Sequence, residues 1–235
     1  MVLHTFALAP AFDHLPDDTE ETLMGSSLHQ GAITALATSL SLCGPRRGLP
    51  WFIGNQIKLI VPRQGRAPYM PSPDILVHPT LTNASRTSLV LTTDGPPALV
   101  IEIASPSTVM SNDLNLTTPQ GKPGVYAALG IAEYLVFDPT AEFVADQVWA
   151  RRLAPDGHEP WLPDGTGRWT SALGIAFAPQ GPLLRVYDQD GRLVPIAEEM
   201  AEMLEQRDRE MTGFLEQRDR QVAALEAEVR RLRGE

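Results

Sequence analysis

Lysine is almost absent from this sequence. Of 19 basic residues only Lys58 and Lys122 are lysine, and all the others are arginine. Cysteine is as scarce, since Cys43 stands alone, so no internal disulfide can form and a reducing, cytoplasmic setting is expected. No apolar run reaches about eighteen residues, and the start lacks a basic stretch followed by an apolar one. The sequence therefore predicts neither a membrane-spanning helix nor a signal peptide.

A positive net charge is also missing. The formal net charge is -10, of which eleven acids and seven arginines from residue 196 onward contribute -4. Proteins that coat DNA non-specifically are usually basic, because their cations neutralise phosphates. Such a protein is disfavoured here, whereas an enzyme that engages phosphate through a metal ion or a partner is not. The hydrophobic content of 43% and charged content of 20% are typical of a globular protein.

Three parts of the chain differ in composition. Residues 1–26 form an acidic, loop-like segment, residues 27–195 an expected α/β domain, and residues 196–235 an expected helix without proline. Within the domain a capping pattern at Ser27–Gln30 and helical apolar spacing predict a helix at 28–43. Apolar runs predict strands at 55–61, from residue 74, at 98–104 and at 132–139, with a short element near 89–91.

The later part of the domain predicts mixed strand directions. A helix at 123–130 between two strands has the order of a βαβ unit, whose strands are parallel. Between residues 143 and 194, short apolar pieces alternate with Pro-Asp-Gly and Gln-Asp-Gly turns. These turns predict antiparallel strands that extend or cover the first sheet.

The last forty residues carry an internal repeat. LEQRDREMTGF at residue 204 is followed by LEQRDRQVAAL at residue 215, and apolar residues such as Leu215, Val222 and Val229 recur at heptad spacing. A helix with such a stripe must bury it. We expect a coiled coil that makes the chain a homodimer, the alternative being a helix that folds back on the domain.

Two acids stand out in the expected sheet. Glu102 interrupts the apolar strand ALVIEIA, and Asp74 begins the strand before it. A buried charge is costly unless it meets a cation, a hydrogen-bond network or a site. Paired strands would bring both carboxylates to one end of the sheet, an arrangement that suits Mg²⁺, or Mn²⁺ in its place. The alternatives are that Asp74 caps a turn and that Glu102 pairs with a buried arginine.

The strings around these acids resemble a known family. PSPDILV, then PPALVIEIASPST, Asp113, and KPGVYAALGIAEYLVFDP resemble the Uma-two family of restriction-endonuclease-like proteins, over about residues 15–195. The resemblance implies a PD-(D/E)XK fold, a mixed sheet flanked by helices, and a metal-dependent DNA endonuclease with Asp74 and Glu102 as ligands. In that superfamily the lysine usually lies two residues after the glutamate, where this chain has Ala104. The resemblance instead implies Lys122 as the third catalytic residue.

One departure from the family pattern concerns this lysine. Eight residues separate Asp113 from Lys122, where relatives typically have three, so the insertion could move Lys122 away from the acids. Four further residues are candidates for the site: Glu20, Glu21, His29 and Asp113. Each also has a structural interpretation, as part of an acidic run, a helix face or a loop. Cys43 is expected in the core.

These observations support more than one function. The first hypothesis is an endonuclease in which metal-activated water hydrolyses DNA phosphodiesters. The second is a nuclease-fold binding or assembly protein with weak or lost activity, which dimerises through its helix. The third is hydrolysis of another phosphoester, because a fold does not fix a substrate.

Overall fold

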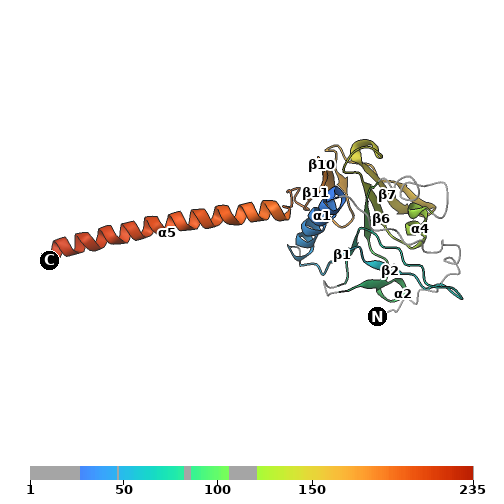
Figure 1. Cartoon of the computed structure of the whole chain (residues 1–235), viewed down its shortest axis with the longest axis horizontal. Coiled ribbons are helices and arrows are strands. Elements are labelled where there is room, and N and C mark those ends of the chain that lie inside the picture. The colour runs from blue at the N-terminus through green and yellow to red at the C-terminus, as the bar shows by residue number, and fades with distance from the viewer. Residues whose placement is uncertain (1–26, 47, 82–85, 106–120, 235) are drawn as a thin grey trace. The chain divides into compact units, whose positions relative to one another are not determined.

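The computed structural model describes residues 27–46, 48–81, 86–105 and 121–234 (Figure 1). The chain divides into two compact units, with the boundary between Val194 and Pro195. The first unit is a mixed α/β fold, and the second is a single long helix.

A six-stranded sheet forms the centre of the first unit. Its spatial order is β1-β3-β5-β6-β7-β8. Strands β5 and β6 run parallel and the other neighbours run antiparallel, as the βαβ and hairpin patterns predict. The bounds are β1 Phe52–Asn55, β3 Ile75–His78, β5 Leu99–Ile103, β6 Glu133–Phe137, β7 Val148–Ala154 and β8 Gly157–Pro160.

Both faces of this sheet are covered. Alternate residues such as Ile75 and Ile101 face helix α1 (Ser27–Arg46) and a second sheet of β9 (Trp169–Thr170), β10 (Ala176–Gln180) and β11 (Leu183–Tyr187). Their neighbours Leu76 and Val100 face helix α4 (Lys122–Ala128) and the pair β2 (Lys58–Ile60) and β4 (Ser88–Val90). Figure 1 shows α1 and α4 on opposite sides of β6. Strands buried on both faces explain the near-continuous apolar runs in the sequence.

The strand expected at 55–61 is wrong as a single element. Within it Asn55 ends β1 and Lys58–Ile60 forms β2, which are strands of different sheets, and the break lies at Gln56 with a φ of 50°. A left-handed residue turns the chain while apolar alternation continues through it, so the pattern conceals the break. The short element expected near 89–91 is β4, followed by helix α2 (Leu91–Asp94).

The other expected elements are confirmed. Helix α1, strands β3, β5 and β6 and helix α4 lie within a few residues of their predicted bounds. Region 143–194 contains the predicted antiparallel strands, joined to β6 through the short helix η3 (Ala145–Gln147). Cys43 is buried in the core, as expected.

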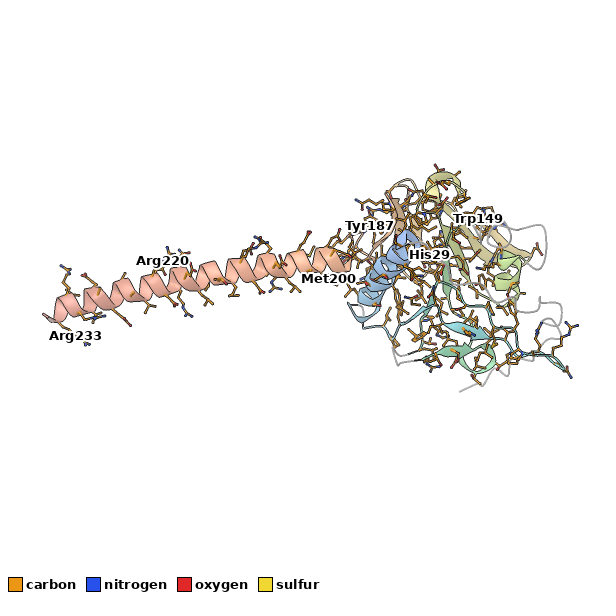
Figure 2. All side chains as sticks on the ribbon, viewed as in Figure 1. His29, Trp149, Tyr187, Met200, Arg220 and Arg233 are labelled. Carbon is orange, nitrogen blue, oxygen red and sulfur yellow. The ribbon has the colours of Figure 1, made fainter. Side chains whose placement is uncertain are left out.

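The second unit is helix α5, Ala197–Arg233. At its start the backbone N–H of Ile196 donates to the Glu199 carboxylate at 3.1 Å, and at its end Gly234 adopts a left-handed φ of 73°. None of its residues is buried, and from Ala201 to the end of the helix all are exposed. Figure 2 shows their side chains projecting from the helix, Arg220 and Arg233 among them. The predicted helix is confirmed. Among the described helices, none combines the length and apolarity required to span a bilayer.

Candidate active site

Asp74 and Glu102 meet at one end of the central sheet. The antiparallel register pairs Ile75 with Ile101 and Leu76 with Val100, so the next residues along, Asp74 and Glu102, lie opposite each other. The backbone N–H of Asp74 points to Oε2 of Glu102 at 3.4 Å. The structure therefore brings together the two acids that the sequence singled out.

The Asp74 carboxylate is held from two other elements. Its Oδ2 accepts a hydrogen bond from the backbone N–H of Ile103 at 2.8 Å and lies 3.3 Å from Nε2 of His29. His29 belongs to the first turn of α1, where Figure 2 labels it, and its side chain is only 11% exposed. Asp74 is thus fixed by β5 and by α1, and the candidate His29 does reach the acid pair.

Glu102 receives its partners from α4. The Tyr126 hydroxyl donates to Oε1 at 2.6 Å, and the Lys122 ammonium lies 3.4 Å from the same oxygen. Glu102 is 2% exposed and Tyr126 is fully buried. Burial, and then the negative charge of Glu102, raise the pKa of Tyr126 well above its ordinary value, so its hydroxyl stays a donor.

Lys122 lies at the acid pair despite the insertion before it. The first residue of α4 is Lys122, and Pro123 follows in the first turn, where proline is tolerated. The Lys122 side chain is only 12% exposed beside Glu102. The sequence departure therefore does not carry the lysine away from the carboxylates.

The donor set suits a hard divalent cation. Among the described residues no three His, Cys, Asp or Glu side chains cluster as a complete metal cage. Mg²⁺ commonly takes one or two carboxylates and completes its shell with water and phosphate oxygens, so Asp74 and Glu102 fit it, whereas a structural zinc site would need more nitrogen or sulfur ligands. Within the described part of the chain, the hydrogen bonds of the Asp74 carboxylate fall on Oδ2, which leaves Oδ1 for a ligand.

Three of the candidate site residues fall outside the part of the chain that the structure describes: Glu20, Glu21 and Asp113. Tyr126 was assigned no role from the sequence, although it lies four positions after Lys122. That spacing places both side chains on one helical face, and it is the signal that could have identified the tyrosine.

Comparisons with known proteins give a family match and a structural neighbour. A family model described as "Uma2: Putative restriction endonuclease" matches residues 17–151. A crystal structure of a "putative nuclease belonging to DUF820" from Anabaena variabilis is similar at 16% identity and a TM-score of 0.38, over 58% of this chain and 68% of that chain. The curated proteins include no significant match.

Proposed function

The chain belongs to the Uma2 family of restriction-endonuclease-like proteins, and from that premise we propose that it is a metal-dependent DNA endonuclease. Its membership confirms the resemblance seen in the PD and EIASPST strings. We assign the catalytic roles to Asp74, Glu102 and Lys122. The observation that carries this proposal is the convergence of two carboxylates and one ammonium within a few ångströms, at one end of the sheet.

The two acids are the proposed ligands of Mg²⁺, or of Mn²⁺ in its place. When bound, such a cation supplies charge neutralisation at the phosphate and activation of the attacking water. The acids contribute two negative charges and Lys122 one positive charge, so the site retains an excess of negative charge that favours a cation. The hydrogen bonds from Ile103 and Tyr126 hold the carboxylates in fixed orientations, which lowers the cost of ordering them on binding.

Lys122 has the proposed role of stabilising charge on the phosphate. Its side chain is only 12% exposed beside Glu102, in surroundings where a positive charge acts more strongly than in bulk water. A scissile phosphate bound against the acid pair would lie close to this ammonium, which would attract the phosphoryl oxygens as their charge increases. His29, beside Asp74, could accept or donate a proton there, and we propose it as an auxiliary residue.

Nicking of supercoiled plasmid in Mg²⁺ or Mn²⁺ tests the proposal. Wild type should nick, and Asp74→Asn, Glu102→Gln and Lys122→Ala should each lose activity by about 10²-fold or more. The matched control is Lys58→Ala, because Lys58 is the other lysine of the chain and is exposed on β2. Equal nicking by all forms, or none by wild type at high concentration, contradicts the assignment.

Self-association is the second part of the proposal. Helix α5 exposes apolar side chains along its length, among them Leu204, Leu225 and Leu232 at 61–74%. Such a stripe favours pairing with another helix. It also supports the alternative function of a nuclease-fold assembly protein with weak activity. An inactive wild type that is dimeric through α5 would favour that alternative.

A further inference from the structure

The apolar stripe of α5 has two charged interruptions. With Leu215, Val222 and Val229 at heptad position a, Asp208 also occupies an a position and Arg218 occupies a d position. The remaining a and d residues from 201 to 232 are apolar: Ala201, Leu204, Met211, Leu225 and Leu232. The positions of the two charges decide which way a second helix can run.

A parallel pair of these helices would place like charges together. In a parallel, in-register coiled coil each a residue faces its own copy, as does each d residue. Asp208 would face Asp208 and Arg218 would face Arg218 within the seam. Like charges in a partly desolvated seam repel strongly, and neither contact meets an opposite charge at an a or d position in that geometry.

An antiparallel pair places opposite charges together. In that geometry a residues face d residues, and setting Asp208 against Arg218 of the second copy fixes the register around Gly213. The same register places Leu204 opposite Val222 and Met211 opposite Leu215. It also sets the small residues Ala197 and Ala201 opposite the larger Val229 and Leu225. Each a–d pair between residues 197 and 229 is therefore complementary in size or in charge.

We propose that α5 binds a second copy of this chain as an antiparallel coiled coil centred on Gly213, with Asp208 paired to Arg218 of the other copy. The proposal sharpens the self-association suggested above by fixing its direction and register. It does not depend on nuclease activity, so either proposal can fail without the other.

Charges beside the seam oppose this pairing, but weakly. The register brings Glu205 near Asp219 and Glu198 near Glu226 of the second copy, and these pairs are acidic. All four residues are exposed, and Asp219 already contacts the Arg218 guanidinium at 2.9 Å. Exposed pairs at a helix surface contribute little to pairing, because water and salt screen them. The two seam contacts therefore dominate.

Charge-reversal variants of the full chain, measured by sedimentation equilibrium, test whether the two α5 helices run antiparallel. Asp208→Arg and Arg218→Asp should each weaken the dimer about tenfold or more, because each converts both seam pairs into like charges. The double exchange should restore wild-type affinity. A parallel dimer would respond to none of these changes, because each residue would still face its own kind. The control Arg220→Asp makes the same charge change at an outward f position.

Spin-label distances test the register. In a Cys43→Ala background, labels at Glu202→Cys should lie about 33 Å apart along the axis, and labels at Ala227→Cys about 42 Å. A parallel dimer would place either pair within about 20 Å, since packed helix axes are about 10 Å apart. Short distances, or a chain that is monomeric in every form, would overturn the proposal.

Discussion

Two buried glutamates lie at opposite ends of the parallel β5–β6 pair. The register sets Glu133 beside Leu99, where β5 begins, and Glu102 beside Val136, near where β5 ends. Each side chain is only 2% exposed. The two carboxylates share a sheet and a degree of burial, but they differ in what surrounds them.

Glu133 is saturated by donors of the fold itself. Its oxygens accept from the Arg152 guanidinium at 3.1 Å, from the backbone N–H of Ala172 at 2.8 Å and from the Ser171 hydroxyl. Arg152 is in turn stacked 4.7 Å over the Trp161 ring. Glu102 also has donors, from Tyr126 and Lys122, but it adjoins a second carboxylate, that of Asp74. A carboxylate saturated by its own fold stabilises the structure, whereas like charges held close together indicate a site that binds something.

The matched substitutions Glu133→Gln and Glu102→Gln should separate these roles most strongly. Glu133→Gln should lower the free energy of unfolding by about 3 kcal/mol, since it leaves the partly buried Arg152 without its counter-charge. Glu102→Gln should cost less, about 1 kcal/mol, because the amide oxygen still accepts from Tyr126 and Asp74 remains as a negative charge near Lys122. Urea denaturation at neutral pH measures both. Equal losses would remove the distinction.

Metal binding should stabilise the protein only through the Glu102 end of the β5–β6 pair. At a concentration about 100 times its dissociation constant, Mg²⁺ or Mn²⁺ should raise the free energy of unfolding by about 2.7 kcal/mol. Thermal unfolding with and without metal should show this increase in wild type and in Glu133→Gln, where that variant is folded. Glu102→Gln should show none. An increase that persists in Glu102→Gln would place the metal elsewhere.

The Tyr126 hydroxyl should contribute a smaller effect at the Glu102 end. Tyr126→Phe removes a buried hydrogen bond to a carboxylate and should cost about 1.5 kcal/mol of stability. It should also reduce metal affinity about tenfold, as loss of a ligand's orienting partner commonly does. Calorimetric metal titration measures the second effect. Tyr187→Phe on β11 is the control and should leave metal affinity unchanged.

A third carboxylate, Asp138, should have the smallest effect on stability, and its effect should depend on pH. Burial alone would raise the pKa of Asp138, but hydrogen bonds from Thr140, Phe143 and Val144 hold it below its ordinary value. This stability is complete above the unfolded pKa of about 4 and is lost as pH falls through the lower folded pKa.

Urea midpoints from pH 7 to pH 2 should show that loss. Wild type should lose about 1 kcal/mol more than Asp138→Asn over this range, because the variant has no carboxylate to protonate. If the free energy of unfolding fell equally in the two proteins as the pH is lowered, the assignment to Asp138 would be contradicted. Asp138→Asn should also be less stable at neutral pH, since its amide can offer one acceptor where the carboxylate offers two.

The sequence predicts the Glu102 end better than the Glu133 end. An acid inside ALVIEIA is visible from alternation alone, whereas the pairing of that strand with the one that Asp74 begins was a condition of the expected site. Pairing with an arginine, the alternative considered for Glu102, is found instead at Glu133, whose partner Arg152 is partly buried. Its partners Arg152 and Ser171 lie 19 and 38 residues further along the chain. No local pattern indicates which carboxylate such distant donors will reach.

Backbone turns explain what else the sequence concealed. Gln56 is neither glycine nor asparagine, so its left-handed conformation has no sequence signal, and the strand appeared continuous there. The position of Lys122 could not be derived either, because a helix start after an insertion depends on packing. The hydrophobic periodicity of α5, by contrast, was sufficient to predict a helix of 37 residues.

The glycine near the middle of α5 sets the spacing between the two helix starts of the proposed dimer. If two copies cross at Gly213, the points where the helices leave Ile196 lie about 50 Å apart, at 1.5 Å per residue. In such a dimer the two chains would enter the coiled coil from opposite ends, so each globular unit would be tethered to its own end of the rod.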